Sequence, residues 1–253
     1  SVMFSEKLPL PRTKNHFVMF ASDRDGFAFC RKNMSRMRNK NVFLCTQETE
    51  NAMLKPEASI RFFSPNDVIA RQFWKERQLW GTERRKLRIA VIGFGNLGKR
   101  MLEKALQLNL YSQEQSISYF VFGEEKRFAW MHSDMDLMND DSIHYYKYDG
   151  KMQWKLLNTM DMVIVTEKAE MSLIQSIAGC TRADCQIYYF NPEADDAARY
   201  LDVNRLIPFG ESSKVFTVEN IKTDIIENRP ETIRRQAINF FTESLRRRLL
   251  TIS

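Results

Sequence analysis

The sequence lacks the features that hold a chain in a membrane or crosslink a small secreted domain. No apolar run approaches the about 18–20 residues that span a bilayer, and no secretory signal is recognisable at the start. None of the four cysteines, Cys30, Cys45, Cys180 and Cys185, forms a C-x-x-C pair. We therefore expect free thiols in a cytoplasmic protein, or in the soluble part of a membrane-attached one, rather than disulfides or a zinc site.

Recognisable catalytic motifs are missing as well. No tyrosine is followed by a lysine four residues later, and the sequence has neither a G-x-S-x-G elbow nor a G-x-x-x-x-G-K-[ST] loop. There are only three histidines, His16, His132 and His144. Their positions favour structural roles. These absences weaken the case for an enzyme without excluding one, and no catalytic residue is assigned.

The composition is that of a folded globular protein. Of the 253 residues, 43% are hydrophobic and 28% are charged, which is enough for one large or two modest domains with proper cores. The formal net charge is +6, and the densest basic cluster is Arg246-Arg247-Arg248. Because such a run is more often a solvated helix face than a binding surface, we do not expect a nucleic-acid partner.

From residue 87 onward, short apolar runs alternate with segments of helical spacing. The first run, LRIAVIG at 87–93, is continuous, as in a strand buried on both faces. The expected strands cover 87–93, 116–123, 142–148, 161–167, 185–191 and 205–211, with helices over 96–109, 125–138 and 171–177. Strands joined by crossover helices form parallel sheets, so this pattern predicts an α/β fold with a doubly wound parallel sheet.

The first 80 residues repeat only the second half of that pattern. HFVMFASDRDGFAF matches DMVIVTEKAEMSLI, NVFLCTQETENAML matches QIYYFNPEADDAARYL, and SIRFFSPNDVIARQF matches RLIPFGESSKVFTVENI. The spacing agrees too, since 25 positions separate Phe17 from Val42 and Met162 from Ile187. We interpret this as an internal repeat with its front half missing, although α/β elements of similar length also match by chance. The expected organisation is a partial domain at 1–80, a linker at 76–85, a complete domain at 87–211 and a helical extension at 212–253.

A glycine-rich turn follows the first strand of the complete copy. Gly93, Gly95 and Gly98 form G-x-G-x-x-G, with Phe94, Asn96 and Leu97 between them. In a strand–turn–helix context the first glycine permits the tight turn, the second lets the backbone approach a pyrophosphate, and the third allows close helix packing. The helix N-terminus offers free N–H groups to phosphates. The motif therefore predicts a nucleotide-binding, Rossmann-like sheet, with a turn kept only for packing as the alternative.

Acidic and polar residues follow two other expected strands. Glu124 and Glu125 come after the second strand, where an acid would accept hydrogen bonds from ribose hydroxyls, or would simply favour a helix N-terminus. The neighbouring Lys126-Arg127 pair would suit a 2′-phosphate instead. Thr166 and Glu167 end the fourth strand, on the side of the sheet where ligands bind, and are candidates for contacts with the nucleoside.

The pattern resembles the TrkA-N or RCK family, the cytoplasmic regulators of potassium channels and transporters. The resemblance rests on IAVIGFGNLGKRM at 89–101, on Glu124 and Glu125, and on the acidic turns ASDRDG at 21–26 and TEKAE at 166–170. It implies a non-catalytic regulatory module that binds NAD or NADH, or alternatively ATP, ADP or NADP. It also implies a homodimer or larger oligomer acting on a membrane channel or transporter.

Two other functions remain open from the sequence. One is an NAD(P)-dependent oxidoreductase whose substrate site carries no recognisable motif. The other is a Rossmann-like scaffold that has lost its ligand and binds protein partners. Turnover of a cofactor would favour the first, and an absence of nucleotide binding would favour the second.

Overall fold

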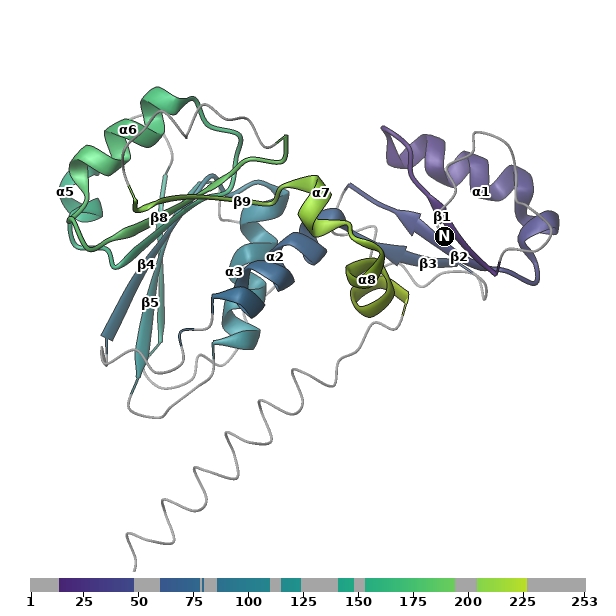
Figure 1. The fold of residues 1–253 in the computed structure, drawn as a ribbon, viewed down its shortest axis with the longest axis horizontal. Helices are drawn as coiled ribbons and strands as arrows, with labels where there is room; N and C mark the ends of the chain where they lie inside the picture. Colours follow the sequence, from purple (N-terminus) through teal and green to yellow (C-terminus); the bar gives the residue numbers. More distant parts are fainter. Residues whose placement is uncertain are drawn as a thin grey trace, which may run out of the picture. The chain divides into compact units, whose positions relative to one another are not determined.

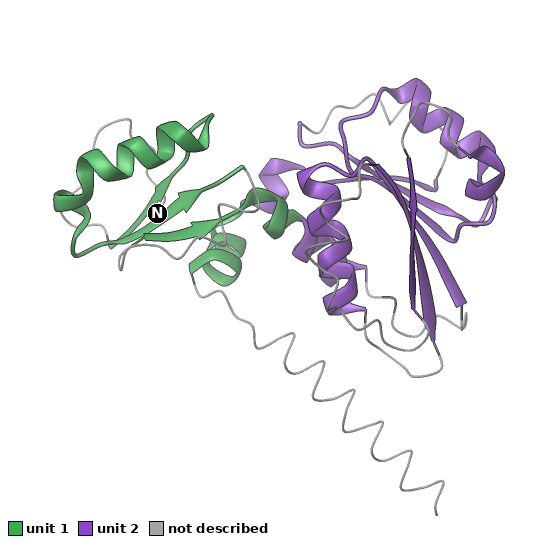
Figure 2. Cartoon of the chain, turned by 180° about the vertical axis from the view of Figure 1, so that it is seen from behind, with its two compact units in different colours: residues 1–69, 216–228 green, residues 70–215, 229–253 purple. Residues whose placement is uncertain are grey.

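The computed structural model describes residues 14–47, 60–77, 79, 86–109, 115–123, 141–147, 153–193 and 204–226. Contacts between Cα atoms divide the chain into two compact units, shown in Figure 2. Unit 1 comprises residues 1–69 and 216–228, and unit 2 comprises residues 70–215 and 229–253. The chain therefore passes from unit 1 to unit 2 and back again. The expected domain bounds, 1–80, 87–211 and 212–253, are not tested by this division and remain a prediction.

Unit 1 contains a parallel three-stranded sheet in the order β1-β2-β3. Its elements are β1 (Asn15–Val18), α1 (Asp23–Met37), β2 (Asn41–Cys45) and β3 (Ile60–Phe63). Helix α1 begins where the Ser22 side chain accepts a hydrogen bond from the Asp25 N–H at 3.2 Å, which satisfies one free donor of the first turn. Between helix and sheet lies a small apolar core formed by Val18, Cys30, Met37, Val42 and Leu44.

Unit 2 contains a six-stranded parallel sheet in the order β6-β5-β4-β7-β8-β9 (Figure 1). Its strands are β4 (Lys86–Ile92), β5 (Ser116–Phe122), β6 (Ser142–Tyr146), β7 (Met162–Val165), β8 (Gln186–Phe190) and β9 (Leu206–Phe209). Its helices include α3 (Asn96–Leu108), α5 (Trp154–Leu157), α6 (Met171–Cys180) and α7 (Ser212–Val215). The chain runs outward from β4 in one direction and then from β7 in the other, which is the doubly wound Rossmann-like arrangement. The fold class expected from the sequence is confirmed.

Alternate residues of the central strands serve opposite faces of this sheet, because side chains along a strand alternate in direction. On one face, Ala90 and Ile92 of β4 join a buried core with Val163 and Val165 of β7 and with residues of α6 such as Ile174. The central strands are buried almost throughout, as β4 has five buried residues out of seven. This explains why they are continuous apolar runs in the sequence rather than alternating ones.

Helix α2 (Pro65–Glu76) crosses the unit boundary, and its second half belongs to unit 2. The Phe73 ring packs edge-on against Tyr188 and Phe209, with ring centres 5.1 and 4.9 Å apart. The indole N–H of Trp74 donates to the Met101 carbonyl of α3 at 2.9 Å. Both side chains are buried. Since Glu76 is helical, the segment that the sequence marked as a linker begins inside a helix.

The half-repeat in unit 1 matches the second half of the unit 2 sheet in strand order and direction. In β2 and β3, Val42 pairs with Ile60, and in β8 and β9, Ile187 pairs with Leu206. These are the pairs that the sequence comparison aligns. Between β1 and β2 the offset is 26 positions (Asn15 with Asn41), whereas between β7 and β8 it is 24 (Met162 with Gln186). The sequence comparison assumed an offset of 25 in both copies, which differs by one residue from the offset observed in each sheet.

Some expectations fall outside the described residues. They include the acids Glu124 and Glu125, the helix expected over 125–138, most of the 76–85 segment and residues 227–253 of the expected helical extension. The described start of the extension expected over 212–253 is helical in α7, in α8 (Val218–Asn220) and in η3 (Ile221–Ile226), a short π-helix. No helix within the described ranges is long and apolar enough to cross a membrane.

Candidate functional site

The candidate site lies at the carboxyl ends of β4 and β7. These two strands are neighbours, and Ile92 at the end of β4 pairs with Val165 at the end of β7. The chain turns in opposite directions after them, toward α3 and toward α6 respectively. Loops on the two sides of such a switch point diverge and leave a crevice, which is where open α/β sheets bind ligands.

The first glycine of the turn has a backbone conformation that side chains rarely adopt. Gly93 has φ of +82°, and its N–H donates to the Phe122 carbonyl at the end of β5 at 3.1 Å. A Cβ atom at this position would also lie 2.7 Å from Cγ of Glu167. Glycine is therefore required here by the backbone and by packing alike.

The third glycine lets α3 press against the end of β4. A Cβ atom on Gly98 would collide with the Gly93 carbonyl oxygen and would lie 2.9 Å from Oγ1 of Thr166. The Thr166 hydroxyl is buried and lies 3.2 Å from the Ile92 carbonyl oxygen, within hydrogen-bonding reach also of the Gly93 carbonyl. Thr166, expected as a possible ligand contact, thus links the end of β7 to the glycine turn by a side-chain hydrogen bond.

The middle glycine has no comparable structural requirement among the described residues. Gly95 has φ of −73° and ψ of −163°, which any residue can adopt. The single described atom near the position of its Cβ would be Oε1 of Glu167, at 3.5 Å, an ordinary contact. Gly95 is also the N-cap of α3, where it provides no capping side chain. The first-turn amides of Asn96, Leu97 and Gly98 therefore have no cap from this residue.

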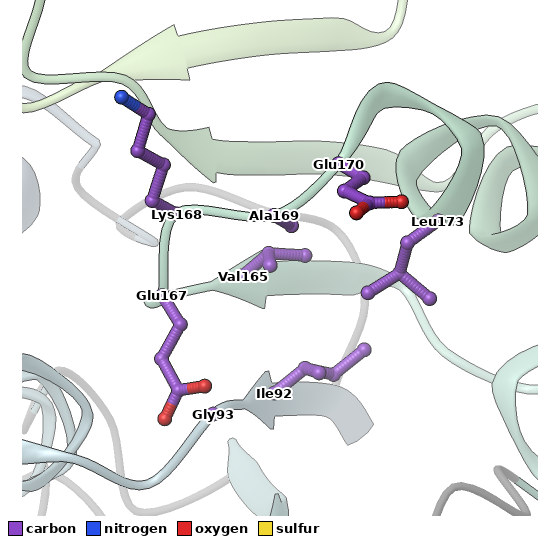
Figure 3. A pocket seen from close by; sticks show the side chains of 8 residues that line it. All are labelled: Ile92, Gly93, Val165, Glu167, Lys168, Ala169, Glu170 and Leu173. Carbon is purple, nitrogen blue, oxygen red and sulfur yellow. The ribbon is translucent and has the colours of Figure 1, made fainter.

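Beside the turn is a pocket of about 210 Å³, shown in Figure 3. Its apolar lining is formed by Ile92, Val165, Ala169 and Leu173, and its remaining lining residues are Gly93, Glu167, Lys168 and Glu170. The apolar members come from the ends of β4 and β7, from the loop after β7 (Ala169) and from the first turn of α6 (Leu173). The pocket thus combines an apolar floor with a few charged groups, as small-molecule sites commonly do.

The charged groups of the pocket point in different directions. The Glu167 carboxylate lies over Gly93, and Lys168 extends away from the other lining side chains (Figure 3). The Lys168 ammonium forms an exposed ion pair with Glu193, with Nζ 2.7 Å from Oε2. Glu170 is the N-cap of α6, and its Oε2 lies 3.4 Å from the Ser172 hydroxyl.

On the other side of the turn, Phe94 packs toward β5 and β6. Its side chain is buried, and its ring lies 6.2 Å from that of Tyr145, in an edge-on arrangement. Gly123, directly after β5, makes room for Phe94, because a Cβ atom there would collide with Phe94 Cβ. The next residues, Glu124 and Glu125, are the expected ribose acceptors and lie outside the described residues.

The structure brings the glycine turn together with Thr166 and Glu167, although more than 65 positions separate them in sequence. Sequence reasoning missed the pocket-lining residues Ile92, Val165, Lys168, Ala169, Glu170 and Leu173. The acidic turn TEKAE, which supported the family resemblance, contains three of them and was the available signal. The apolar members could not be distinguished from ordinary core residues by their pattern alone.

Neither metal nor thiol chemistry is indicated here. In the part of the chain that the structure describes, no group of three or more His, Cys, Asp or Glu side chains could hold a metal ion. No cysteine lines the pocket. Cys185 of unit 2 is buried, and burial raises the pKa of its thiol to about 11.

No protein-family model matches the sequence, and no curated protein matches it. Among solved structures, similar ones include shikimate dehydrogenase from Aquifex aeolicus, with 11% identity, a TM-score of 0.45, and coverage of 91% of this chain and 99% of that one. Shikimate 5-dehydrogenase from Listeria monocytogenes, in complex with shikimate and NAD, has 9% identity, a TM-score of 0.44 and coverages of 92% and 98%. A D-isomer specific 2-hydroxyacid dehydrogenase from Xanthobacter autotrophicus has 11% identity, a TM-score of 0.35 and coverages of 89% and 82%. At these values the similarities carry no inference about ligand or activity, and membership of the TrkA-N or RCK family stays a prediction.

Proposed function

We propose that unit 2 binds a nicotinamide dinucleotide, NAD or NADP, with its pyrophosphate over the glycine turn. Gly95 is the observation that carries this proposal. The fold explains Gly93 by its positive φ and Gly98 by its contact with the Gly93 carbonyl, but no described neighbour explains Gly95. A pyrophosphate approaching the backbone at the start of α3 would require glycine there and would meet the first-turn N–H groups.

The two halves of the dinucleotide would lie over different halves of the sheet. In this kind of fold the half that contains the glycine motif takes the adenosine part, and an acid after its second strand binds the ribose. Glu124 and Glu125 are candidates for that role. The other nucleotide would then lie toward β7, where Glu167 and the pocket lie.

We place an oxidoreductase first among the uses of the bound dinucleotide. Hydride transfer at a nicotinamide ring is assisted by a group that donates or accepts a proton nearby. The pocket on the β7 side is lined by three ionisable side chains, Glu167, Lys168 and Glu170. Their position beside the expected nicotinamide supports this use, and the substrate would be a small molecule with an oxidisable hydroxyl or a reducible carbonyl.

A second candidate use is nucleotide sensing in the regulation of potassium transport. It is favoured by the parallel β1-β2-β3 sheet of unit 1, whose β2–β3 pairing matches that of β8 and β9. Tandem copies of this kind are what the resemblance to TrkA-N and RCK proteins implies. In this use the chain would bind the dinucleotide without turnover, as a homodimer or larger oligomer on a membrane channel or transporter.

Calorimetric titration with NAD⁺, NADH, NADP⁺, ATP and ADP tests the binding proposal. The wild type should bind a dinucleotide, and Gly95→Asp should weaken binding by about tenfold or more, because a carboxylate would face the pyrophosphate. Aspartate is a good N-cap residue, so this variant should keep α3 folded. Gly179→Ala is the matched control, since Gly179 has no described atom within 4 Å of its Cβ position. Equal binding by wild type and Gly95→Asp would contradict the proposal.

A further inference from the structure

We propose that the pocket beside the glycine turn prefers the oxidised form of the nicotinamide dinucleotide over the reduced form. The inference rests on the dinucleotide-binding function proposed above and specifies which redox form that site selects. The two forms differ by one charge at the ring, since the oxidised nicotinamide is a cation and the dihydronicotinamide is neutral. A site with net negative charge beside the ring distinguishes them.

The side chains that line the pocket include more acids than bases. Glu167 and Glu170 both line the pocket, and Lys168 is the single cation among the eight lining residues. The Lys168 ammonium is held 2.7 Å from the Glu193 carboxylate, outside the set of lining residues. Figure 3 shows its side chain extending away from the other lining side chains. The Lys168 charge is thus paired with Glu193, and the two carboxylates give the remaining lining side chains a net negative charge.

The floor of the pocket is apolar. Ile92, Val165 and Leu173 provide an apolar surface suited to a flat aromatic ring. Ile92 and Val165 are almost completely buried. A ring seated on that surface loses part of its hydration. The attraction between its charge and nearby carboxylates then increases, because less water lies between them.

The size of the preference follows from the exposure of the two acids. Both Glu167 and Glu170 are exposed, so water screens most of their field. Two unit charges about 4 Å apart in water attract by about 1 kcal/mol, which corresponds to roughly a fivefold change in affinity. We therefore expect each carboxylate to favour the oxidised form by about three- to tenfold. A tenfold preference would lower the potential of the bound two-electron couple by about 30 mV.

The two carboxylates differ in a way that the test can use. Glu167 lies over Gly93, with Oε1 3.5 Å from the Cβ position of Gly95, so it would also face the pyrophosphate. Its replacement by glutamine should therefore strengthen the binding of both redox forms while reducing the preference between them. Glu170, the N-cap of α6, instead accepts a hydrogen bond from the Ser172 hydroxyl of its own helix at 3.4 Å. Its replacement should change the preference alone.

The experiment is a calorimetric titration of the full chain with NAD⁺ and with NADH. The wild type should bind NAD⁺ more tightly, and Glu170→Gln should weaken NAD⁺ about three- to tenfold while changing NADH less than about twofold. Asp184→Asn is the control for loss of one negative charge, because Asp184 precedes β8 at the opposite end of the strands and pairs with Arg182 at 3.2 Å. It should leave the ratio of the two affinities unchanged.

Three results would overturn the inference. Tighter binding of NADH by the wild type would contradict it, as would an equal effect of Glu170→Gln on both forms. A change in the ratio of the same size in Asp184→Asn would show that net charge rather than the pocket is responsible. If neither form binds the wild type, the dinucleotide-binding proposal itself fails, which separates that failure from a loss of redox preference alone.

Discussion

At the scale of single residues, one buried hydroxyl links the glycine turn to the end of β7. The buried Thr166 side chain reaches the carbonyls of Ile92 and Gly93, the last residue of β4 and the first of the turn. The hydroxyl thus links two neighbouring strand ends, whose backbones pair up to Ile92 and Val165. A threonine after an apolar strand is common, so the sequence alone does not reveal this role.

Thr166→Val should lower the free energy of unfolding by about 1–3 kcal/mol, because the Gly93 carbonyl loses the hydroxyl donor while side-chain volume is kept, and the Ile92 carbonyl keeps only the Thr166 backbone N–H. Denaturant unfolding measures the difference. Thr159→Val is the matched control, since the Thr159 hydroxyl also donates to a backbone carbonyl, that of Leu156 at 2.7 Å, but in an exposed position. An equal cost in both variants would contradict the role of Thr166 as a fastener of the turn.

Gly179→Ala should stabilise the protein by about 0.5–1 kcal/mol. Gly179 lies in α6, is exposed, and has open space where a Cβ atom would be. Alanine restricts the unfolded chain and favours the helix. Thermal unfolding measures the gain. A loss of stability would show that glycine is needed at this position for a reason outside the described contacts.

The buried thiols should be unreactive in the folded protein. Burial, with a smaller contribution from the Asp23 carboxylate, raises the pKa of Cys45 to about 11, and burial raises that of Cys185 to about 11. Since the thiolate is the reactive form, alkylation at pH 8 should be slow at both residues until the chain unfolds. Mass spectrometry of samples alkylated for increasing times measures the rate of modification at each cysteine. Rapid modification of Cys45 or Cys185 in the native protein would contradict this expectation.

The same shifts imply a loss of stability in alkali. The folded pKa values of Cys45 and Cys185 lie above the ordinary value of 9.0, so the folded state retains protons that the unfolded state releases. Their contribution to stability is complete below about pH 9 and is lost as the pH rises toward 11. Cys185→Ala, measured by denaturant unfolding at pH 8 and pH 10, should reduce the fall in stability between the two.

At the scale of elements, α2 stabilises unit 2 through its last turns. Phe73 packs on Tyr188 of β8 and Phe209 of β9, while Trp74 is tied to α3. Phe73→Ala should cost about 3–5 kcal/mol, because it leaves a cavity in a buried aromatic cluster. The exposed Trp154 of α5 offers the control, since Trp154→Ala removes a larger ring from the surface. Comparable costs for the two variants would show that the Phe73 cluster is not a core.

Element types were more predictable from the sequence than element roles. The strand β4 and helix α3 are recognisable because a buried parallel strand is a continuous apolar run and an amphipathic helix repeats every 3.6 residues. The short α5 is missed because four residues carry no periodicity. Only Glu76, the last residue of α2, lies in the segment interpreted as a linker. The sequence does not show which core the aromatic residues before it join.

At the scale of the whole molecule, the sequence predicted a half-copy and a complete copy of one parallel fold, and the strand orders agree with this prediction. The glycine turn was predictable because its three glycines stand at fixed spacing after a strand. The pocket was not, because it depends on β4 and β7 lying side by side, and strand neighbours far apart in the chain leave no local signal. Lys168 and Glu170 can be recognised as pocket-lining residues only once β4 and β7 are known to be neighbours.

In the proposed complex, the pyrophosphate of the dinucleotide lies against the N–H groups at the start of α3. The most direct measurement is a heteronuclear NMR titration that follows individual backbone amides as NAD⁺ is added. We expect the amide resonances of Asn96, Leu97 and Gly98 to move with saturation while that of Gly179 stays fixed. In Gly95→Asp the same changes should require NAD⁺ concentrations about tenfold higher or more. Unchanged resonances at these three amides under saturating NAD⁺, NADH and NADP⁺ would contradict the account and leave the glycine turn with a packing role alone.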